Sequence, residues 1–202
     1  MSKIIHTVGN MVTIPDESSL SQHETSNCII FVGKMSYEPN IVAVTFFTKK
    51  IFPVLKRKYP ELEFLIIGAN PDERVKQLMA TDGVNVTGYV DSVEPYFKRA
   101  TIVVAPMLTG AGIQNKIIQA MSYGCCVATT AIGAEGLTIS KEEIAIYNKE
   151  TEWIDGLEYL LNNREIRRNM GQMARWYVRQ NLSKEVISKQ FWAFVNNKNV
   201  NK

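Results

Sequence analysis

Short apolar runs, each closed by a glycine or proline and followed by a helical stretch, constrain the fold of this chain most strongly. In Thr101–Leu137 an apolar run stops at Pro106, a loop with glycines at positions 110 and 112 follows, and a helical stretch leads into the apolar run CCVATT. Strand, glycine loop, helix and strand in this order form a βαβ unit. Backbone N–H groups at such a loop favour an anion, usually a phosphate. We therefore expect this segment to contact a ligand.

The same alternation extends over most of the chain. Further strands are predicted at 28–32, 63–67, 84–87 and 144–147. Helices are predicted at 40–59, 71–80, 93–99, 153–162, 164–180 and 184–196. Pro53 predicts a bend or break in the first of these helices. Continuous apolar strands between helices indicate an α/β fold with a parallel sheet covered by helices on both faces.

Composition excludes several classes of function. The 202 residues are 46% hydrophobic and carry a formal charge of +3 spread along the chain, which argues against nucleic-acid binding. No apolar run approaches the roughly 18 residues of a membrane span, and the first residues lack a signal-peptide pattern, so a cytoplasmic location is expected. The adjacent Cys125 and Cys126 lie in an apolar run and are expected to be buried, reduced thiols. With only His6 and His23, no histidine-rich metal site is expected.

Glycines follow three of the predicted strands, at Gly33, Gly68 and Gly88. Each glycine taken alone is explained by a tight turn. Ligands in parallel sheets bind at the carboxyl ends of the strands, however. Because several glycines are expected there together with the loop 109–116, a binding crevice is the better interpretation.

Four motifs in this order resemble a known family. FVGKMSYEPN, LIIGANP, VTGYVDS and GAGIQNKIIQAMSYGCCVATTAIGAEGL are similar to the C-terminal domain of GT-B retaining glycosyltransferases of the group 1 or family 4 type. The resemblance covers about Cys28–Asn181. It implies a leader or hinge-like segment at 1–27, a Rossmann-like nucleotide-sugar-binding domain at 28–181, and a C-terminal helix and tail at 182–202. That domain is one half of a GT-B fold.

The resemblance also implies roles for individual residues. The residues expected near the donor phosphates are Gly33, Lys34, Gly110, Ala111, Gly112 and Lys116. The residues expected near the base and ribose are Thr87, Gly88, Tyr89 and Gln119. A cation at Lys34 would offset charge on the leaving diphosphate. Glu135 is a candidate sugar contact; it and Lys116 are also explained by simple solvent exposure.

Three positions depart from the family pattern. Gln119 stands where relatives carry a glutamate that bonds the ribose, and a neutral amide makes a weaker bond than a carboxylate. Ala111 stands where many relatives have another glutamate. Relatives carry a second basic residue at a position that corresponds to 38–40 here, but none of these three residues is basic in this chain.

The resemblance therefore leaves the activity open. The first hypothesis is the donor-binding domain of a glycosyltransferase for polysaccharide or glycoconjugate synthesis, lacking the acceptor domain. A separate chain would supply that domain and attach the protein peripherally to the inner membrane. No metal, other cofactor or catalytic residue is assigned, and the only ligand expected is the nucleotide-sugar donor.

Two other hypotheses remain. The second is an inactive, degenerate domain that serves as a partner or assembly module. The third, a dinucleotide-dependent oxidoreductase, is disfavoured because the third glycine of its fingerprint falls at Asn115. The aromatic residues Phe191, Trp192 and Phe194 on the terminal helix either pack on the domain's own core or form a docking patch.

Overall fold

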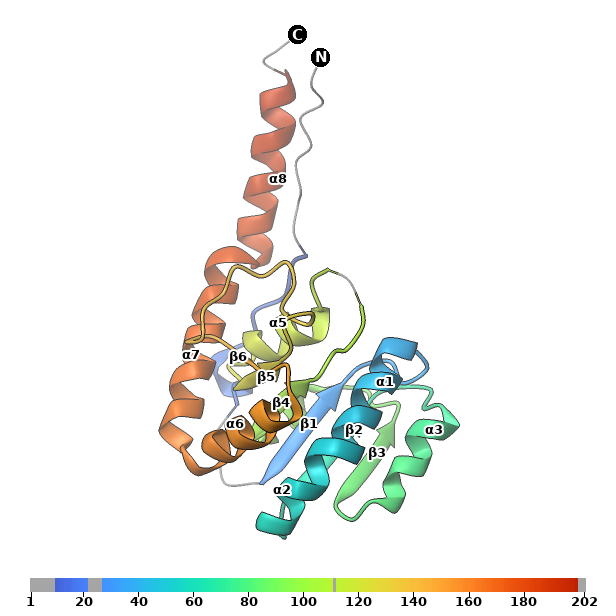
Figure 1. The fold of residues 1–202 in the computed structure, drawn as a ribbon. Helices are drawn as coiled ribbons and strands as arrows, with labels where there is room; N and C mark the ends of the chain where they lie inside the picture. Colours follow the sequence, from blue (N-terminus) through green and yellow to red (C-terminus); the bar gives the residue numbers. More distant parts are fainter. Residues whose placement is uncertain (1–9, 22–26, 111, 200–202) are drawn as a thin grey trace.

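A computed structural model describes residues 10–21, 27–110 and 112–199 (Figure 1). Its centre is a six-stranded sheet with the strand order β3-β2-β1-β4-β5-β6. Every neighbouring pair of strands runs parallel. The strands are β1 Cys28–Val32, β2 Glu63–Ile67, β3 Val84–Gly88, β4 Ile102–Ala105, β5 Val127–Thr129 and β6 Ala145–Ile146. The predicted α/β class is therefore confirmed.

Helices connect these strands in the alternating pattern that the sequence indicates. The α-helices are α1 Glu38–Phe46, α2 Phe52–Lys58, α3 Glu73–Lys76, α4 Glu94–Arg99, α5 Asn115–Ser122, α6 Glu150–Asn162, α7 Arg164–Asn181 and α8 Lys184–Asn199. The described residues also include turns of other helix types at η1 Glu17–Ser19, η2 Phe47–Ile51 and η3 Gln77–Ala80.

The predicted helix at 40–59 is interrupted before Pro53. A π-helical turn, η2, separates α1 from α2, and Pro53 lies in the first turn of α2. Proline has no N–H to donate to the carbonyl four residues earlier, and a π-turn absorbs that missing bond without ending the helix. Side chains of η2 remain in the core, where the centre of the Phe47 ring lies 4.7 Å from the centre of the Phe64 ring and 6.0 Å from that of Trp153.

The order in which the chain adds strands to the sheet reverses between β1 and β4, in the middle of the sheet. From β1 the chain proceeds outward to β2 and β3, whereas from β4 it proceeds to β5 and β6 on the other side. Because such crossovers are right-handed, the helices that follow β1 and β4 cover opposite faces of the sheet. The loops after these two central strands therefore diverge, and a crevice at this switch point is where doubly wound sheets bind ligands.

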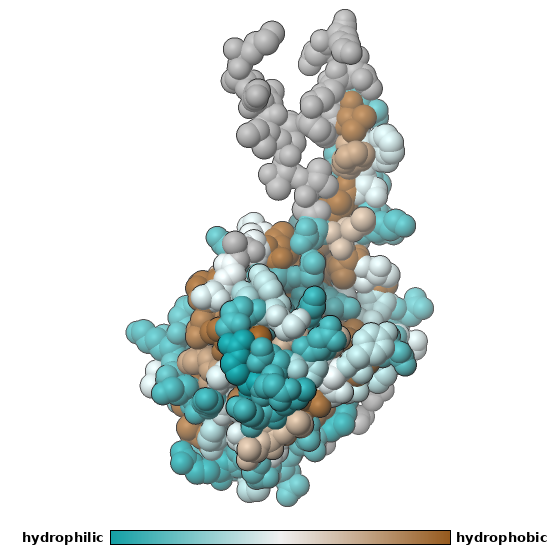
Figure 2. Space-filling model, turned by 90° about the vertical axis from the view of Figure 1, so that its right-hand side faces the viewer, coloured by the Kyte–Doolittle hydropathy of each residue, from teal (hydrophilic) through white to brown (hydrophobic). Residues whose placement is uncertain are grey.

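The last helix extends away from the sheet. In Figure 1, α8 projects beyond the body of the molecule after leaving α7. Figure 2 shows hydrophobic residues along this helix above a largely hydrophilic body. Phe191 is 44% exposed and Trp192 59% exposed, so these two aromatic residues do not pack in the domain's own core. The side chain of Phe194 lies outside the described part of the structure.

The described part of the leader packs on the same domain. The Val12 N–H donates to Leu182 O (3.0 Å), and the Ser21 N–H donates to Tyr123 O (2.9 Å). Residues 10–21 are thus held against α5 and the junction of α7 with α8.

Candidate functional site

The ends of β1, β2 and β3 are joined at their glycines. The Gly33 N–H donates to Ile67 O (2.9 Å), and the Gly68 N–H donates to Gly88 O (3.2 Å). A Cβ on Gly68 would lie 1.7 Å from the Gly33 carbonyl oxygen, so a larger residue cannot fit without moving this backbone. The three glycines singled out in the sequence therefore lie together at the carboxyl edge of the sheet.

The loop after β4 requires glycine at two positions. Gly110 has φ +125° and Gly112 has φ +71°, in the region that residues with a Cβ rarely adopt. The base of the loop is fixed by the Thr130 hydroxyl, which donates to Met107 O (2.6 Å). Ala111, between the two glycines, lies outside the described residues.

A carboxylate already sits on this loop. The Gly112 N–H donates to Oε2 of Glu135, which comes from the loop after β5, at 3.2 Å. Both residues are exposed. The amide of Gly112 is therefore oriented toward, and accessible to, a negatively charged oxygen.

Lys116, in the first turn of α5, is the half-buried cation beside this loop. Its Nζ lies 3.1 Å from Gln114 Oε1, 3.7 Å from Met107 Sδ and 5.5 Å from the centre of the Phe31 ring on β1. No carboxylate pairs with it among the described residues. Burial lowers the pKa of Lys116 to about 8. The two central strands thus place an unpaired ammonium group at the switch point.

Lys34 follows Gly33 but is exposed to solvent. Its carbonyl oxygen accepts a hydrogen bond from Nδ2 of the buried Asn40 (2.9 Å), which fixes the backbone of this loop. No hydrogen bond or ion pair joins the Lys34 side chain to the glycine loop among the described residues. The structure therefore brings the two loops to the same edge of the sheet and leaves the Lys34 ammonium free to reach a ligand.

The remaining expected donor contacts lie on either side of this centre. Thr87 and Gly88 end the outer strand β3, and Tyr89 follows it. Tyr89 is 75% exposed, and a Cβ on Gly88 would meet nothing within 4 Å. Gln119 lines a cleft of about 630 Å³ between α5, the start of α4 and the segment Met11–Ser19.

Two other polar residues in this cleft were not among the site residues expected from the sequence. Asn115 accepts a hydrogen bond from Asn10 (2.9 Å), and Glu94 accepts one from Ser19 (2.8 Å) and pairs with Lys98 (3.0 Å). Asn115 lies within the fourth motif and one helical turn before Gln119 on α5, whereas Glu94 lies outside the four motifs. Only the fold brings Glu94 to Gln119.

Metal ligands and thiols are the other chemical groups for which the sequence led to expectations. No group of three or more histidine, cysteine, aspartate or glutamate residues there is arranged to hold a metal ion. The cysteines are free and buried, and burial raises the pKa of Cys126 to about 12 and that of Cys125 further. His6 and His23 lie outside the described residues. No described helix is long and apolar enough to cross a membrane.

Together, the strand order and the glycine loops at the carboxyl edge define a doubly wound α/β domain. The sequence pattern of the family described as glycosyl transferases group 1 matches residues 26–163. This chain belongs to that family.

Two curated relatives are identical to this chain at about a quarter of the aligned positions. One is an uncharacterised 44.6 kDa protein in the cps region of Klebsiella pneumoniae, 27% identical over 134 residues that make up 61% of this chain and 34% of that protein. The other is an uncharacterised glycosyltransferase of Haemophilus influenzae, 28% identical over 135 residues, or 62% of this chain and 38% of that protein. The matched region thus spans little more than a third of either relative.

Solved structures show the same fold. A mutant of S. aureus TarM in complex with fondaparinux, alpha-GlcNAc-glycerol and UDP is 17% identical, with a TM-score of 0.76 over 95% of this chain and 39% of that one. The C-terminal domain of a group 1 glycosyl transferase (LpcC) from Francisella tularensis is 17% identical, with a TM-score of 0.61 over 77% of this chain and 86% of that one. The predicted Rossmann-like half of a GT-B fold is confirmed.

Proposed function

We propose that this domain binds the nucleoside-diphosphate-sugar donor of a glycosyltransferase. The observation that carries the proposal is the half-buried ammonium of Lys116, which has no carboxylate partner among the described residues and lies beside the glycine loop at the switch point of the sheet. Burying a cation that has only neutral partners is unfavourable, and a ligand that supplies the opposite charge offsets this cost. A diphosphate between Gly112 and Lys116 would do so.

The chemistry then follows from charge. When the bond between sugar and diphosphate breaks, negative charge grows on the leaving nucleoside diphosphate. In our proposal the amide of Gly112, the ammonium of Lys116 and the exposed ammonium of Lys34 stabilise that charge. Gly33 and Gly110 allow the backbone to approach it, Ala111 lies in the same loop, and Glu135 faces the sugar.

The nucleoside is assigned to the flanks of the crevice. We place the base against Thr87, Gly88 and Tyr89, and the ribose near Gln119, whose amide can both donate and accept hydrogen bonds. The acceptor site is assigned to a separate domain or chain, because the described residues form a single sheet. Any attachment to the inner membrane would come through that partner. The cps-region relative supports a role in polysaccharide synthesis.

One observation favours the alternative of an inactive assembly module. The Gly112 amide is already occupied by the Glu135 carboxylate (3.2 Å), and Gln119 replaces a charged group. In that case the domain keeps its fold but does not bind nucleotides, and the exposed Phe191 and Trp192 serve a partner.

Calorimetric titration with UDP, GDP and their sugar conjugates separates the two functions. Donor binding predicts saturable binding of one nucleoside diphosphate, weakened about tenfold or more by Lys116→Met. The matched control is Lys189→Met on α8, an exposed lysine away from the crevice, which leaves the affinity unchanged. Absence of binding at millimolar nucleotide would remove the donor-binding proposal and leave the assembly module.

A further inference from the structure

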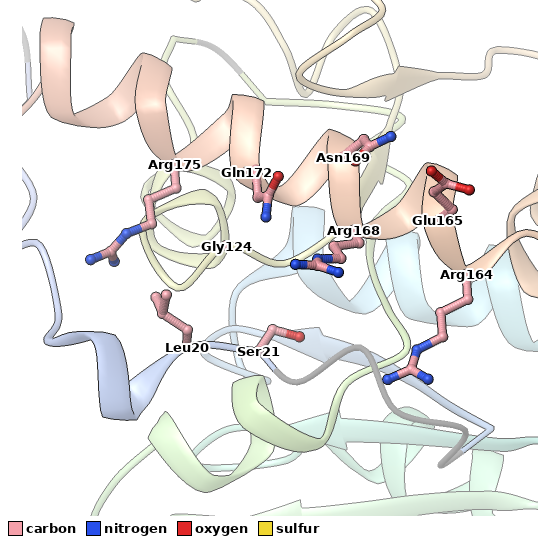
Figure 3. A pocket seen from close by; sticks show the side chains of 9 residues that line it. All are labelled: Leu20, Ser21, Gly124, Arg164, Glu165, Arg168, Asn169, Gln172 and Arg175. Atoms are coloured by element: carbon pink, nitrogen blue, oxygen red, sulfur yellow. The ribbon is translucent and has the colours of Figure 1, made fainter.

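A second basic pocket lies at the other end of the sheet. It has a volume of about 600 Å³ and lies between α7, the turn at Gly124 and the leader residues Leu20 and Ser21 (Figure 3). Gly124 precedes β5, and the Ser21 hydroxyl contacts the carbonyl oxygen of Ala100, just before β4 (3.4 Å). The pocket is therefore at the amino ends of the strands, opposite the proposed donor site.

Three arginines of α7 point toward this pocket. Arg168 and Arg175 follow Arg164 by four and eleven positions, a spacing that places all three on one face of a helix. Figure 3 shows all three side chains leaving α7 on the side that faces Leu20 and Ser21.

Arg175 forms a fixed wall of the pocket. Its guanidinium donates to Ser122 O (2.7 Å), to Pro15 O (2.9 Å) and to the Glu17 carboxylate (3.1 Å). Its donors are committed to the protein, so Arg175 positions the leader and is not the group available to a ligand.

Arg164 and Arg168 have no such partners. Neither makes a hydrogen bond or ion pair with any described residue, and both are exposed. Like charges four residues apart on a helix repel each other, and Arg164, in the first turn of α7, is a cation at the positive end of the helix dipole. Glu165 is the single carboxylate among the residues that line the pocket. This arrangement is unfavourable for folding by itself, and a bound anion would reverse both effects.

We propose that Arg164 and Arg168 bind a phosphate group in this pocket. Guanidinium forks match the oxygens of phosphate in paired hydrogen bonds, which a lysine ammonium does not. The amides of Asn169 and Gln172, which also line the pocket, offer further donors to whatever carries the phosphate. The source is a soluble phosphate ester or a lipid headgroup. The site is separate from the donor crevice and does not depend on the function proposed above.

The test is an NMR titration with inorganic phosphate that follows the arginine Nε–Hε signals. The signals of Arg164 and Arg168 are expected to shift saturably. In the double variant Arg164→Gln/Arg168→Gln, phosphate affinity at this pocket, read from the backbone amides of Gly124 and Ser21, falls about tenfold or more. Because it removes a repulsive pair, the double variant is also expected to melt no lower than the wild type.

The control removes the same charge elsewhere. Arg57→Gln/Arg179→Gln takes two exposed arginines from outside the pocket and should leave the titration unchanged. If the Arg164 and Arg168 signals do not shift, or if the control weakens binding as much as the double variant, the proposed site is refuted.

Sedimentation with vesicles distinguishes the two sources of the phosphate. A headgroup ligand predicts that phosphatidylglycerol vesicles, but not phosphatidylcholine vesicles, sediment the wild type and the control more than the double variant. A soluble ligand predicts that inorganic phosphate shifts the Arg164 and Arg168 signals, but that the two kinds of vesicle sediment the wild type, the control and the double variant equally. If neither probe depends on Arg164 and Arg168, the proposal fails.

Discussion

Lys116 illustrates at the residue scale how a binding group can oppose folding. Its ammonium is half-buried without a carboxylate among the described residues, and burial lowers its pKa to about 8. The charged form is therefore less stable in the folded chain than in the unfolded chain, where a lysine pKa is about 10.4. This cost is fully present below pH 8 and decreases as the pH rises from 8 toward the unfolded pKa.

Lys116→Met should consequently stabilise the ligand-free domain. We expect the free energy of unfolding to rise by about 1 to 3 kcal/mol at pH 7, and the gain to shrink toward zero by roughly pH 10.4. Urea denaturation at several pH values measures both. A variant that is less stable than wild type at pH 7 would contradict the assignment of Lys116 as a desolvated cation.

Glu135 is expected to compete with the diphosphate for Gly112 and to contribute to sugar recognition. Glu135→Gln removes a negative charge from beside the loop, so UDP or GDP should bind about two- to fivefold more tightly. The sugar conjugate should lose its advantage over the free nucleotide. Glu142→Gln, on an exposed loop, is the control, and calorimetry is the measurement. Weaker binding of the free nucleotide by Glu135→Gln would contradict this role.

Gly68 and Gly88 form a matched pair for the geometry of the strand ends. Both have positive φ, but a Cβ at Gly68 would meet the Gly33 carbonyl at 1.7 Å, whereas one at Gly88 would meet nothing within 4 Å. Gly88→Ala should cost about 1 to 2 kcal/mol from backbone strain. Gly68→Ala should cost about 3 kcal/mol or more because backbone must also move. If thermal denaturation shows an equal loss of stability for the two variants, the backbone at Gly68 is not in contact with the Gly33 carbonyl at the end of β1.

At the scale of elements, Arg175 connects three parts of the chain. It joins α7 to the end of α5 through Ser122 and to the leader through Pro15 and Glu17. Arg175→Met leaves the Ser122 and Pro15 carbonyl groups without this donor, so unfolding should become easier by about 2 to 4 kcal/mol. The exposed Arg179→Met, on the same helix, should change stability by less than about 0.5 kcal/mol. Similar effects of the two variants would show that the leader is not held by Arg175.

Most helices and strands were predictable, because continuous apolar runs indicate buried strands and apolar residues at three- and four-residue steps indicate the buried face of a helix. Pro53 indicated an interruption, but the sequence does not say whether the helix bends, breaks or forms a π-turn, since that depends on packing around Phe47. The cleft at Gln119 was not predictable either. Its walls come from α5, from Glu94 and from the leader, three segments that are distant in sequence and meet only after folding.

At the scale of the whole molecule, the strand order determines where ligand chemistry is expected. The reversal between β1 and β4 places the loops after these strands at one edge of the sheet, beside the switch point, and the glycines at both loops were visible in the sequence. The burial of Lys116 was not visible, because it depends on Phe31 and Met107 approaching from two other segments. The arginine pocket on α7 was missed for the same reason. Its spacing is ordinary for a surface helix.

The most direct test of the central claim is a backbone-amide NMR titration of the domain with the nucleoside diphosphate that calorimetry selects. The account predicts that the largest shifts cluster at Gly33, Gly110, Gly112 and Lys116, and that in Lys116→Met this cluster saturates only at about tenfold higher nucleotide concentration or more. Shifts that instead centre on Arg164 and Arg168, with the glycine loop unaffected, would contradict the assignment of the donor diphosphate to the switch point.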